Sequence, residues 1–155
     1  MTDSPRFAAD EMLGSLARWL RIMGFDTLYC RDLSDDQIIE AVKREGRILL
    51  TRDYELAQRF PGTSLLVESD DLDHQLRQVS ARFALLPDED LARCTVCNGE
   101  LNRVSPDDVK GDVPAGVQER NKEFFRCTRC FKVYWKGTHW QNIRKRFESI
   151  DDQTL

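Results

Sequence analysis

The chain has 155 residues, of which 41% are hydrophobic and 32% are charged, and its formal net charge is -4. This composition is typical of a folded protein with one domain, or one domain and a small module, and it excludes a disordered or membrane chain. No apolar run approaches the ~20 residues of a membrane span. The first residues, MTDSPRF, lack the layout of a signal peptide, so we expect a cytoplasmic protein.

The first ninety residues alternate between short apolar runs and segments with the apolar spacing of helices. Ser34–Gln37 has the form of a helix capping box, and Gly24 and Gly46 stand where two helices would end. We expect strands at 6–9, 25–30, 47–51 and 63–68, and helices at 13–23, 34–45, 53–60 and 71–85, the last capped by Asp70. This alternation predicts an α/β fold with a parallel sheet covered by helices on both faces.

A linker is expected at residues 86–90, LPDED, because the composition changes beyond it. We therefore divide the chain into an α/β domain at 1–88 and a second module at 89–155. Residues 1–90 contain 11 Lys and Arg against 18 Asp and Glu, whereas residues 120–147 contain nine basic residues and one acidic residue. The two parts of the chain are expected to have different roles.

Aspartates follow each of the four expected strands. Asp10 comes directly after the first strand and Asp53 directly after the third. In an open parallel sheet, ligands bind beyond the carboxyl ends of the strands, where such side chains would meet. The other aspartates at these ends are Asp32, Asp35 and Asp36 after the second strand, and Asp70 and Asp71 after the fourth.

Two interpretations of these aspartates remain open. Aspartate is a preferred residue at helix N-termini, so helix caps alone could produce the pattern. Alternatively, carboxylates gathered at one rim would bind Mg²⁺ or Mn²⁺, which prefer hard oxygen ligands. A divalent ion held there can activate water and neutralise charge on a phosphodiester.

Four of the five cysteines form two C-x-x-C pairs, Cys94 with Cys97 and Cys127 with Cys130. Each tight turn offers two thiolates, so the two pairs predict one tetrahedral structural zinc site. Iron bound by the same four ligands is the alternative. The 29 residues between the pairs exceed the usual spacing, so we expect a folded insertion at 105–118.

Basic and aromatic side chains alternate around the second cysteine pair, in EFFRCTRCFKVYWKGTHW. Basic residues attract phosphate and exposed aromatic rings stack on unpaired bases, so this stretch predicts an RNA-binding surface. The alternative for most of the aromatic residues is that they form the small core of the module. Thr138–Gln141 would cap a basic helix that follows. The candidate RNA-binding residues here are Arg126, Arg129, Lys132, Lys136, Arg144 and Lys145.

These features together resemble a known family. The stretches FAADEMLGSLARWLRIMGFDTLY, SDDQIIEAVKREGRILLTRD, LLVESDD and the cysteine-rich segment are similar to the PIN-like ribonuclease domain. This domain occurs at the C-terminus of mutator-type exoribonucleases and as stand-alone prokaryotic proteins. The resemblance implies a PIN-like three-layer α/β/α sandwich, a small zinc ribbon with four cysteine ligands after it, and hydrolysis of RNA.

The resemblance also implies roles for individual residues. By motif, Asp10, Asp35 and Asp53 match the catalytic acids that would hold Mg²⁺ or Mn²⁺. Asp36 is a neighbouring candidate ligand, and Asp70 or Asp71 would be a weaker fourth. Arg52, beside Asp53, would contact phosphate or pair with a neighbouring acid.

Two functions follow as hypotheses. The first is a metal-dependent endoribonuclease whose zinc ribbon helps to bind RNA. The second is a non-catalytic RNA-binding or adaptor protein, in which the aspartates cap helices and the ribbon binds RNA or a protein partner. An inhibitor protein is a further candidate partner of the first.

Overall fold

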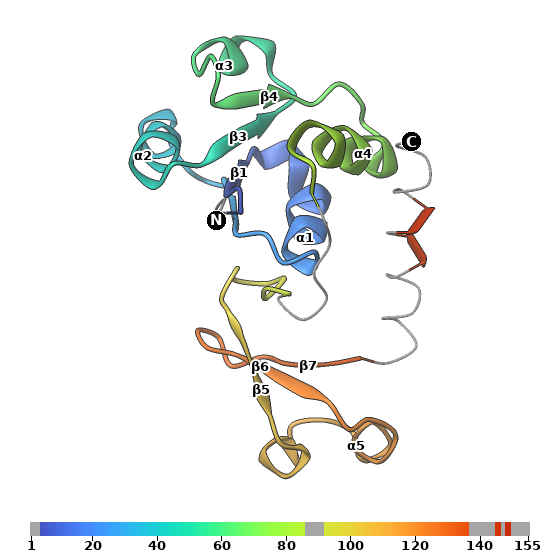
Figure 1. Cartoon of the computed structure of the whole chain (residues 1–155). Coiled ribbons are helices and arrows are strands. Elements are labelled where there is room, and N and C mark those ends of the chain that lie inside the picture. Colours follow the sequence, from blue (N-terminus) through green and yellow to red (C-terminus); the bar gives the residue numbers. More distant parts are fainter. Residues whose placement is uncertain (1–3, 86–91, 137–144, 147, 150–155) are drawn as a thin grey trace.

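Four parallel strands form the sheet of the N-terminal part of the computed structural model, which describes residues 4–85, 92–136, 145–146 and 148–149 (Figure 1). The strands are β1 (Phe7–Ala9), β2 (Thr27–Tyr29), β3 (Ile48–Thr51) and β4 (Ser64–Leu66), and they lie in the order β2-β1-β3-β4. In the central register, Ala8 pairs with Leu28 on one side and Leu49 on the other. The predicted parallel sheet is confirmed.

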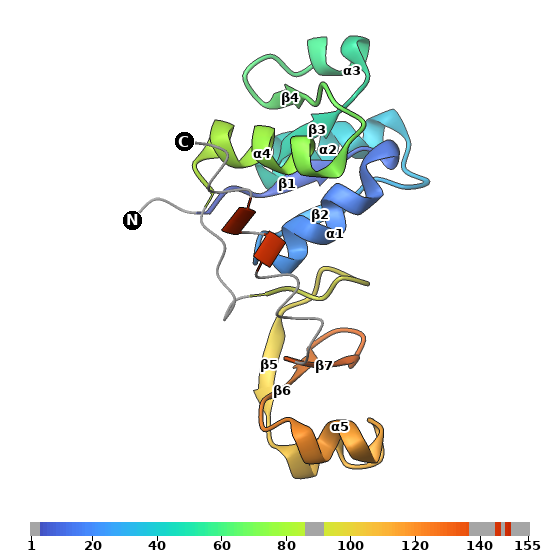
Figure 2. The same cartoon turned by 90° about the vertical axis from the view of Figure 1, so that its right-hand side faces the viewer.

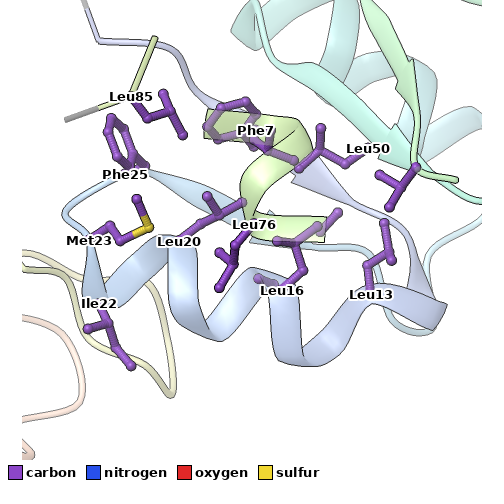
Figure 3. Packing of buried hydrophobic residues seen from close by; sticks show 14 residues of the cluster. Phe7, Leu13, Leu16, Leu20, Ile22, Met23, Phe25, Leu50, Leu76 and Leu85 are labelled. Carbon is purple, nitrogen blue, oxygen red and sulfur yellow. The ribbon is translucent and has the colours of Figure 1, made fainter. Parts of the chain in front are cut away.

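Helices cover both faces of this sheet. They are α1 (Gly14–Ile22), α2 (Asp35–Glu45), α3 (Tyr54–Gln58) and α4 (Leu72–Phe83), with a short 3-10 helix, η1 (Glu11–Leu13), before α1. Side chains alternate along each strand, so Phe7 packs with Leu16, Leu20 and Leu76 from α1 and α4 (Figure 3). Ala8 points the other way and packs with Ile38 of α2 and with the other residues of the second core, Cys30, Val42, Leu49 and Phe60. The result is an α/β/α sandwich.

Local sequence signals set the ends of the helices. The capping box of Ser34 and Gln37 is present at the start of α2, and Gly46 ends that helix with a φ of 67°. The cap of α4 differs from the prediction, because Asp71 and not Asp70 accepts the helix N–H, that of His74. Either aspartate could cap a helix, and the first helical residue, Leu72, decides which one does.

The second part of the chain is a three-stranded antiparallel ribbon. Its strands are β5 (Leu101–Val104), β6 (Phe124–Cys127) and β7 (Val133–Trp135), in the order β5-β6-β7. The predicted insertion is folded, and it contains η3 (Pro106–Val109) and α5 (Ala115–Arg120). A small core anchors it to the ribbon; its buried members are Val109, Val113 and Phe124.

Polar contacts join the ribbon to β2 and α1. The amide oxygen of Asn98 accepts the backbone N–H of Thr27 at 3.0 Å, and its amide nitrogen donates to Asp26 at 2.6 Å. Arg21 donates from Nε to the carbonyl of Thr27 and from Nη1 to the carbonyl of Thr95, both at 2.9 Å. The N–H of Arg93 in turn donates to the carbonyl of Arg21 at 2.8 Å. These contacts fix the ribbon to β2, which is an edge strand of the sheet.

A helical piece near the end of the chain returns to α1 and α4 (Figure 2). Arg146 donates from Nε to Asp73 at 2.7 Å, and its guanidinium lies 4.8 Å from the ring centre of Trp19. The predicted linker at 86–90 and the predicted cap at 138–141 lie outside the described residues. Within the described residues, none of the helices is long and apolar enough to cross a membrane.

Candidate functional site

Asp10 and Asp53 lie at the carboxyl ends of the neighbouring strands β1 and β3, joined through one side chain. The hydroxyl of Thr51 donates to Oδ2 of Asp10 at 2.8 Å and accepts the backbone N–H of Asp53 at 3.0 Å. Thr51 is fully buried, whereas Asp10 is partly and Asp53 largely exposed. We call this group, Asp10, Thr51 and Asp53, the acidic rim.

Both aspartates of the acidic rim also cap helices. Oδ1 of Asp10 accepts the N–H of Glu11 at 2.7 Å, and Oδ1 of Asp53 accepts the N–H groups of Glu55 and Leu56 at 2.9 and 3.2 Å. These bonds fix the orientation of both carboxylates. Each carboxylate can accept about four hydrogen bonds or ligands, so capping leaves capacity for a metal ion.

The other predicted acids lie at the N-termini of helices. Asp35 and Asp36 begin α2, and Asp71 caps α4. Asp35 pairs with Arg59 at 3.3 Å, and the exposed fractions of these two side chains are 71% and 48%. Among the described residues, these acids do not join the acidic rim in a compact group of three potential metal ligands. The structure therefore joins Asp10 to the backbone of Asp53 through Thr51, while the roles of all five aspartates as metal ligands stay predictions.

Arg52 stands between Thr51 and Asp53 in the sequence and is partly exposed. Its Nε is buried and has no hydrogen-bond partner in the described part of the chain. A buried donor without a partner is uncommon in folded proteins and calls for an explanation.

The four cysteines of the two pairs meet at one point of the ribbon. Their sulfur atoms all lie within 4.8 Å of one another, with Cys94 to Cys130 at 3.6 Å and Cys97 to Cys127 at 3.4 Å. Tetrahedral zinc with Zn–S bonds of ~2.3 Å requires sulfur separations of about 3.8 Å. Among the described residues, no other group of three or more such ligands is as compact. The donor set fits a structural metal ion.

The four cysteines differ in how their surroundings favour the thiolate form that a metal requires. The pKa values of Cys94 and Cys127 are lowered, whereas burial and the contact with Cys127 raise the pKa of Cys97 to about 11, and the pKa of Cys130 is also raised. Burial alone would raise the pKa of Cys127, but bonds from the N–H groups of Cys130 and Arg129 offset this and lower the pKa to about 6. On the other pair, the hydroxyl of Tyr134 lies 3.0 Å from the sulfur of Cys94. Burial, reinforced by this contact, raises the pKa of Tyr134 to about 12, so it stays a hydrogen-bond donor at neutral pH.

The sequence model of the Mut7-C RNAse domain matches residues 5–147. The chain belongs to this family. A search of curated proteins and a search of solved structures each found no match. As a Mut7-C RNAse domain, the chain is a member of a ribonuclease family, and the combination of an α/β sheet with a group of four cysteines agrees with the resemblance found in the sequence.

The predicted RNA-binding residues of this Mut7-C RNAse domain differ in their surroundings. Arg126 pairs with Asp112 at 2.9 Å, and Lys136 pairs with Glu123 at 3.7 Å. Those with exposed side chains are Arg129, Lys132 and Lys145. Arg144 lies outside the described residues.

The aromatic residues of the ribbon only partly form its core. Phe124 is fully buried, and Phe125 and Tyr134 are partly buried. Phe131 and Trp135, however, expose 63% and 38% of their surface. For these two residues the interpretation as core is wrong, because the module is too thin to cover every ring.

Sequence reasoning missed a charged network at the junction of ribbon and sheet. Arg47 pairs with Asp26 at 2.8 Å and also donates to the carbonyl of Phe7 at 3.1 Å. Beside this pair, a cavity of about 360 Å³ lies between β2 and the first cysteine pair. No motif marks these residues, because Asp26 and its partner Asn98 are 72 positions apart.

Proposed function

We propose that this chain is a metal-dependent endoribonuclease that hydrolyses RNA phosphodiester bonds, and that its zinc ribbon helps to bind the RNA. The observation that carries this proposal is the acidic rim, in a chain that belongs to a ribonuclease family. A divalent ion bound by hard carboxylate oxygens supplies an activated water and stabilises charge on the scissile phosphate. Mg²⁺ commonly takes only one or two protein carboxylates and keeps several waters, so Asp10 and Asp53 suffice as its anchors.

In this proposal the residues of the rim position one another. Asp10 and Asp53 bind the ion, and the hydroxyl of Thr51 fixes the distance between the two chain segments. Asp35, and Asp36 beside it, would complete the site from α2. An exposed ion pair such as Asp35 with Arg59 contributes about 0–1 kcal/mol, so exchanging Arg59 for a metal costs little. Asp71 would be an outer ligand.

Cations are proposed to hold the phosphates of the RNA. Arg52, next to Asp53 in the sequence, would donate from its guanidinium to a phosphate oxygen beside the bound ion. Arg129, Lys132 and Lys145 are exposed and would attract the RNA backbone. The four thiolates of the ribbon leave no open coordination position, so zinc there has a structural role.

A specific observation also favours the alternative, a non-catalytic RNA-binding or adaptor protein. Asp10, Asp53 and Asp71 each cap a helix, and capping alone would explain an aspartate at these places. Asn caps a helix about as well as Asp, but it lacks the charge that a catalytic metal requires. The substitution Asp53→Asn therefore separates the two functions.

The experiment measures cleavage of a circular single-stranded RNA in Mn²⁺ or Mg²⁺ and in buffer without added divalent ions, with the zinc content checked in each sample. A circular substrate reports only internal cleavage. We expect metal-dependent cleavage by the wild type and a loss of at least ~100-fold for Asp10→Asn and Asp53→Asn, with unchanged melting temperatures. Intact RNA with the wild type across metals and substrates would instead support the binding protein. Full activity of both variants would show that the acidic rim is not the catalytic site.

A further inference from the structure

The two cysteine pairs form turns that are equivalent residue by residue. In the first turn, Cys94 donates its N–H to the carbonyl of Gly99 at 2.9 Å, and Asn98 donates its N–H to the carbonyl of Cys94 at 2.9 Å. In the second turn, Cys127 donates to Lys132 at 2.9 Å and Phe131 donates to Cys127 at 3.1 Å. Phe131 therefore occupies in the second turn the place that Asn98 occupies in the first.

This place requires a left-handed backbone. The φ angles of Asn98 and Phe131 are 67° and 64°. Asparagine adopts this conformation comparatively readily, whereas a bulky side chain rarely does. A phenylalanine is thus an unfavourable choice for the turn itself, and strained positions of this kind concentrate at functional sites.

Packing does not explain the phenylalanine either. Asn98 is only 7% exposed, and its side chain bonds to Thr27 and Asp26. Phe131 is 63% exposed. The first turn thus docks inward on the sheet, whereas the second turn presents an aromatic ring to the solvent.

The surroundings of the ring are basic. Arg129 and Lys132 flank Phe131 and are exposed, and within the described residues neither forms an ion pair with a carboxylate. The segment from Phe124 to Lys136 contains four basic residues and no acidic residue. Lys132 also lies 5.2 Å from the ring centre of Tyr134. An apolar protein surface would offer the two cations no anionic partner, whereas a nucleic acid offers a base to the ring and phosphates to the cations.

We propose that Phe131 is a stacking platform for an unpaired base of single-stranded RNA, with Arg129 and Lys132 on the adjacent phosphates. The inference rests on the proposed function, since it takes RNA as the substrate, and it adds the form of RNA that the ribbon holds. Duplex RNA keeps its bases stacked inside the helix and offers the ring no free face.

The test measures binding without cleavage, in the full chain carrying Asp10→Asn and in buffer without Mg²⁺ or Mn²⁺. The probe is a single-stranded RNA that contains 2-aminopurine, whose fluorescence is quenched when it stacks on an aromatic ring. Phe131→Asn gives the second turn the same residue that the first turn has at the equivalent position, Asn98. Phe131→Trp keeps a ring, and Val96→Asn is the matched control, because Val96 is 62% exposed on the first turn.

We expect Phe131→Asn to weaken binding of the single-stranded probe about 5- to 100-fold, as for other base-stacking residues, and to remove the quenching. Its zinc content and melting temperature should be unchanged or higher, because the strain is relieved. Phe131→Trp and Val96→Asn should bind and quench like the parent protein. Binding of duplex RNA should be equal in all four proteins.

Unchanged single-strand binding by Phe131→Asn, or an equal loss of single-strand and duplex binding, would overturn the proposal. A parent protein that binds no RNA would also overturn it, and would favour contact with a protein partner as the role of Phe131. The catalytic proposal is tested separately, because cleavage by otherwise wild-type protein depends on Asp10 and not on this binding measurement. Stacking without cleavage would leave the ribbon as an RNA-binding module beside an inactive rim.

Discussion

Thr51 donates its hydroxyl hydrogen to the carboxylate of Asp10 across 2.8 Å, and the two residues stand at the carboxyl ends of adjacent strands. The same hydroxyl accepts the N–H of Asp53. One buried oxygen therefore sets the positions of both proposed metal ligands, so its removal should affect cleavage more than folding.

Thr51→Val keeps the shape of the side chain and removes both hydrogen bonds. We expect cleavage to fall about 10- to 100-fold, the usual cost of losing a partner that orients a metal ligand. The free energy of unfolding should fall by only about 1 kcal/mol. Thr51→Ser retains the hydroxyl and should retain most of the activity. Equal activity of the Val and Ser variants would show that the hydroxyl does not position the rim.

Protonation of Asp26 at acid pH should lower the stability of the fold. Burial alone would raise the pKa of Asp26, but hydrogen bonds from Arg47 and Asn98 more than offset it and hold the pKa below its ordinary value of 3.8. The stabilisation from this carboxylate is therefore complete above that ordinary value and is lost as the pH falls through the lower pKa of the folded state. It should be present throughout the neutral range.

Asp26→Asn should lower the free energy of unfolding at pH 7 by about 1.5–3 kcal/mol, because it removes one of the two carboxylates that pair with Arg47 and leaves only that of Glu45. The difference from the wild type should shrink below about pH 4. Urea unfolding across this pH range measures it. Glu40→Gln, which breaks only an exposed pair with Arg44, is the control, and it should change stability by less than about 0.5 kcal/mol. A pH-independent difference for Asp26→Asn would contradict the assignment.

Gly99 should be required for metal binding. A Cβ atom at this position would lie 2.7 Å from the sulfur of Cys127, closer than real Cβ atoms approach, and at a tight 3.2 Å from that of Cys97. Gly99→Ala should therefore weaken zinc affinity at least ~10-fold, measured by competition with a chromophoric chelator. Gly116→Ala in α5 is the matched control, because its Cβ would meet only the end of Arg120, 3.4 Å away. Normal zinc affinity of Gly99→Ala would show that the sulfur positions can adjust.

The contacts of Arg146 with Asp73 and Trp19 should stabilise the packing of this segment against the sandwich. Arg146→Ala removes its ion pair with Asp73 and its contact with the ring of Trp19, and we expect a loss of about 1 kcal/mol in the free energy of unfolding. Lys145→Ala is the control. It changes the exposed residue next to Arg146 and should leave the free energy of unfolding unchanged. In a double-mutant cycle, the losses from Arg146→Ala and Asp73→Ala should not add. Strict additivity would argue that the pair contributes nothing.

The elements of the sandwich could be predicted because their signals are local. Capping residues, the glycines that end helices and the apolar spacing lie within a few positions of one another, as for Ser34, Gln37 and Gly46. The predicted positions of the ends of the helices and strands were less exact. The predicted cap Asp70 stands next to Asp71, and both residues have the same local chemistry.

The site was predictable in part. The aspartates after β1 and β3 could be expected to meet because parallel strands end at the same rim. Burial of the ribbon's aromatic rings could not be predicted, since it depends on which side of a thin module each ring faces. The contacts of Asp26, Arg21 and Asn98 were also beyond reach, because they join segments more than 70 positions apart.

The contacts that Asn98 and Arg21 make with Thr27 have a consequence for the isolated N-terminal part. An outermost strand whose N–H and C=O groups lack partners is a template for pairing with another chain. In the whole chain the N–H of Thr27 in β2 is bound by Asn98 of the first cysteine turn, and the carbonyl of Thr27 is bound by Arg21 of α1. Separated from its ribbon, the sandwich would lose the partner of the Thr27 N–H on its outermost strand, and this free donor could pair with a second copy of the chain.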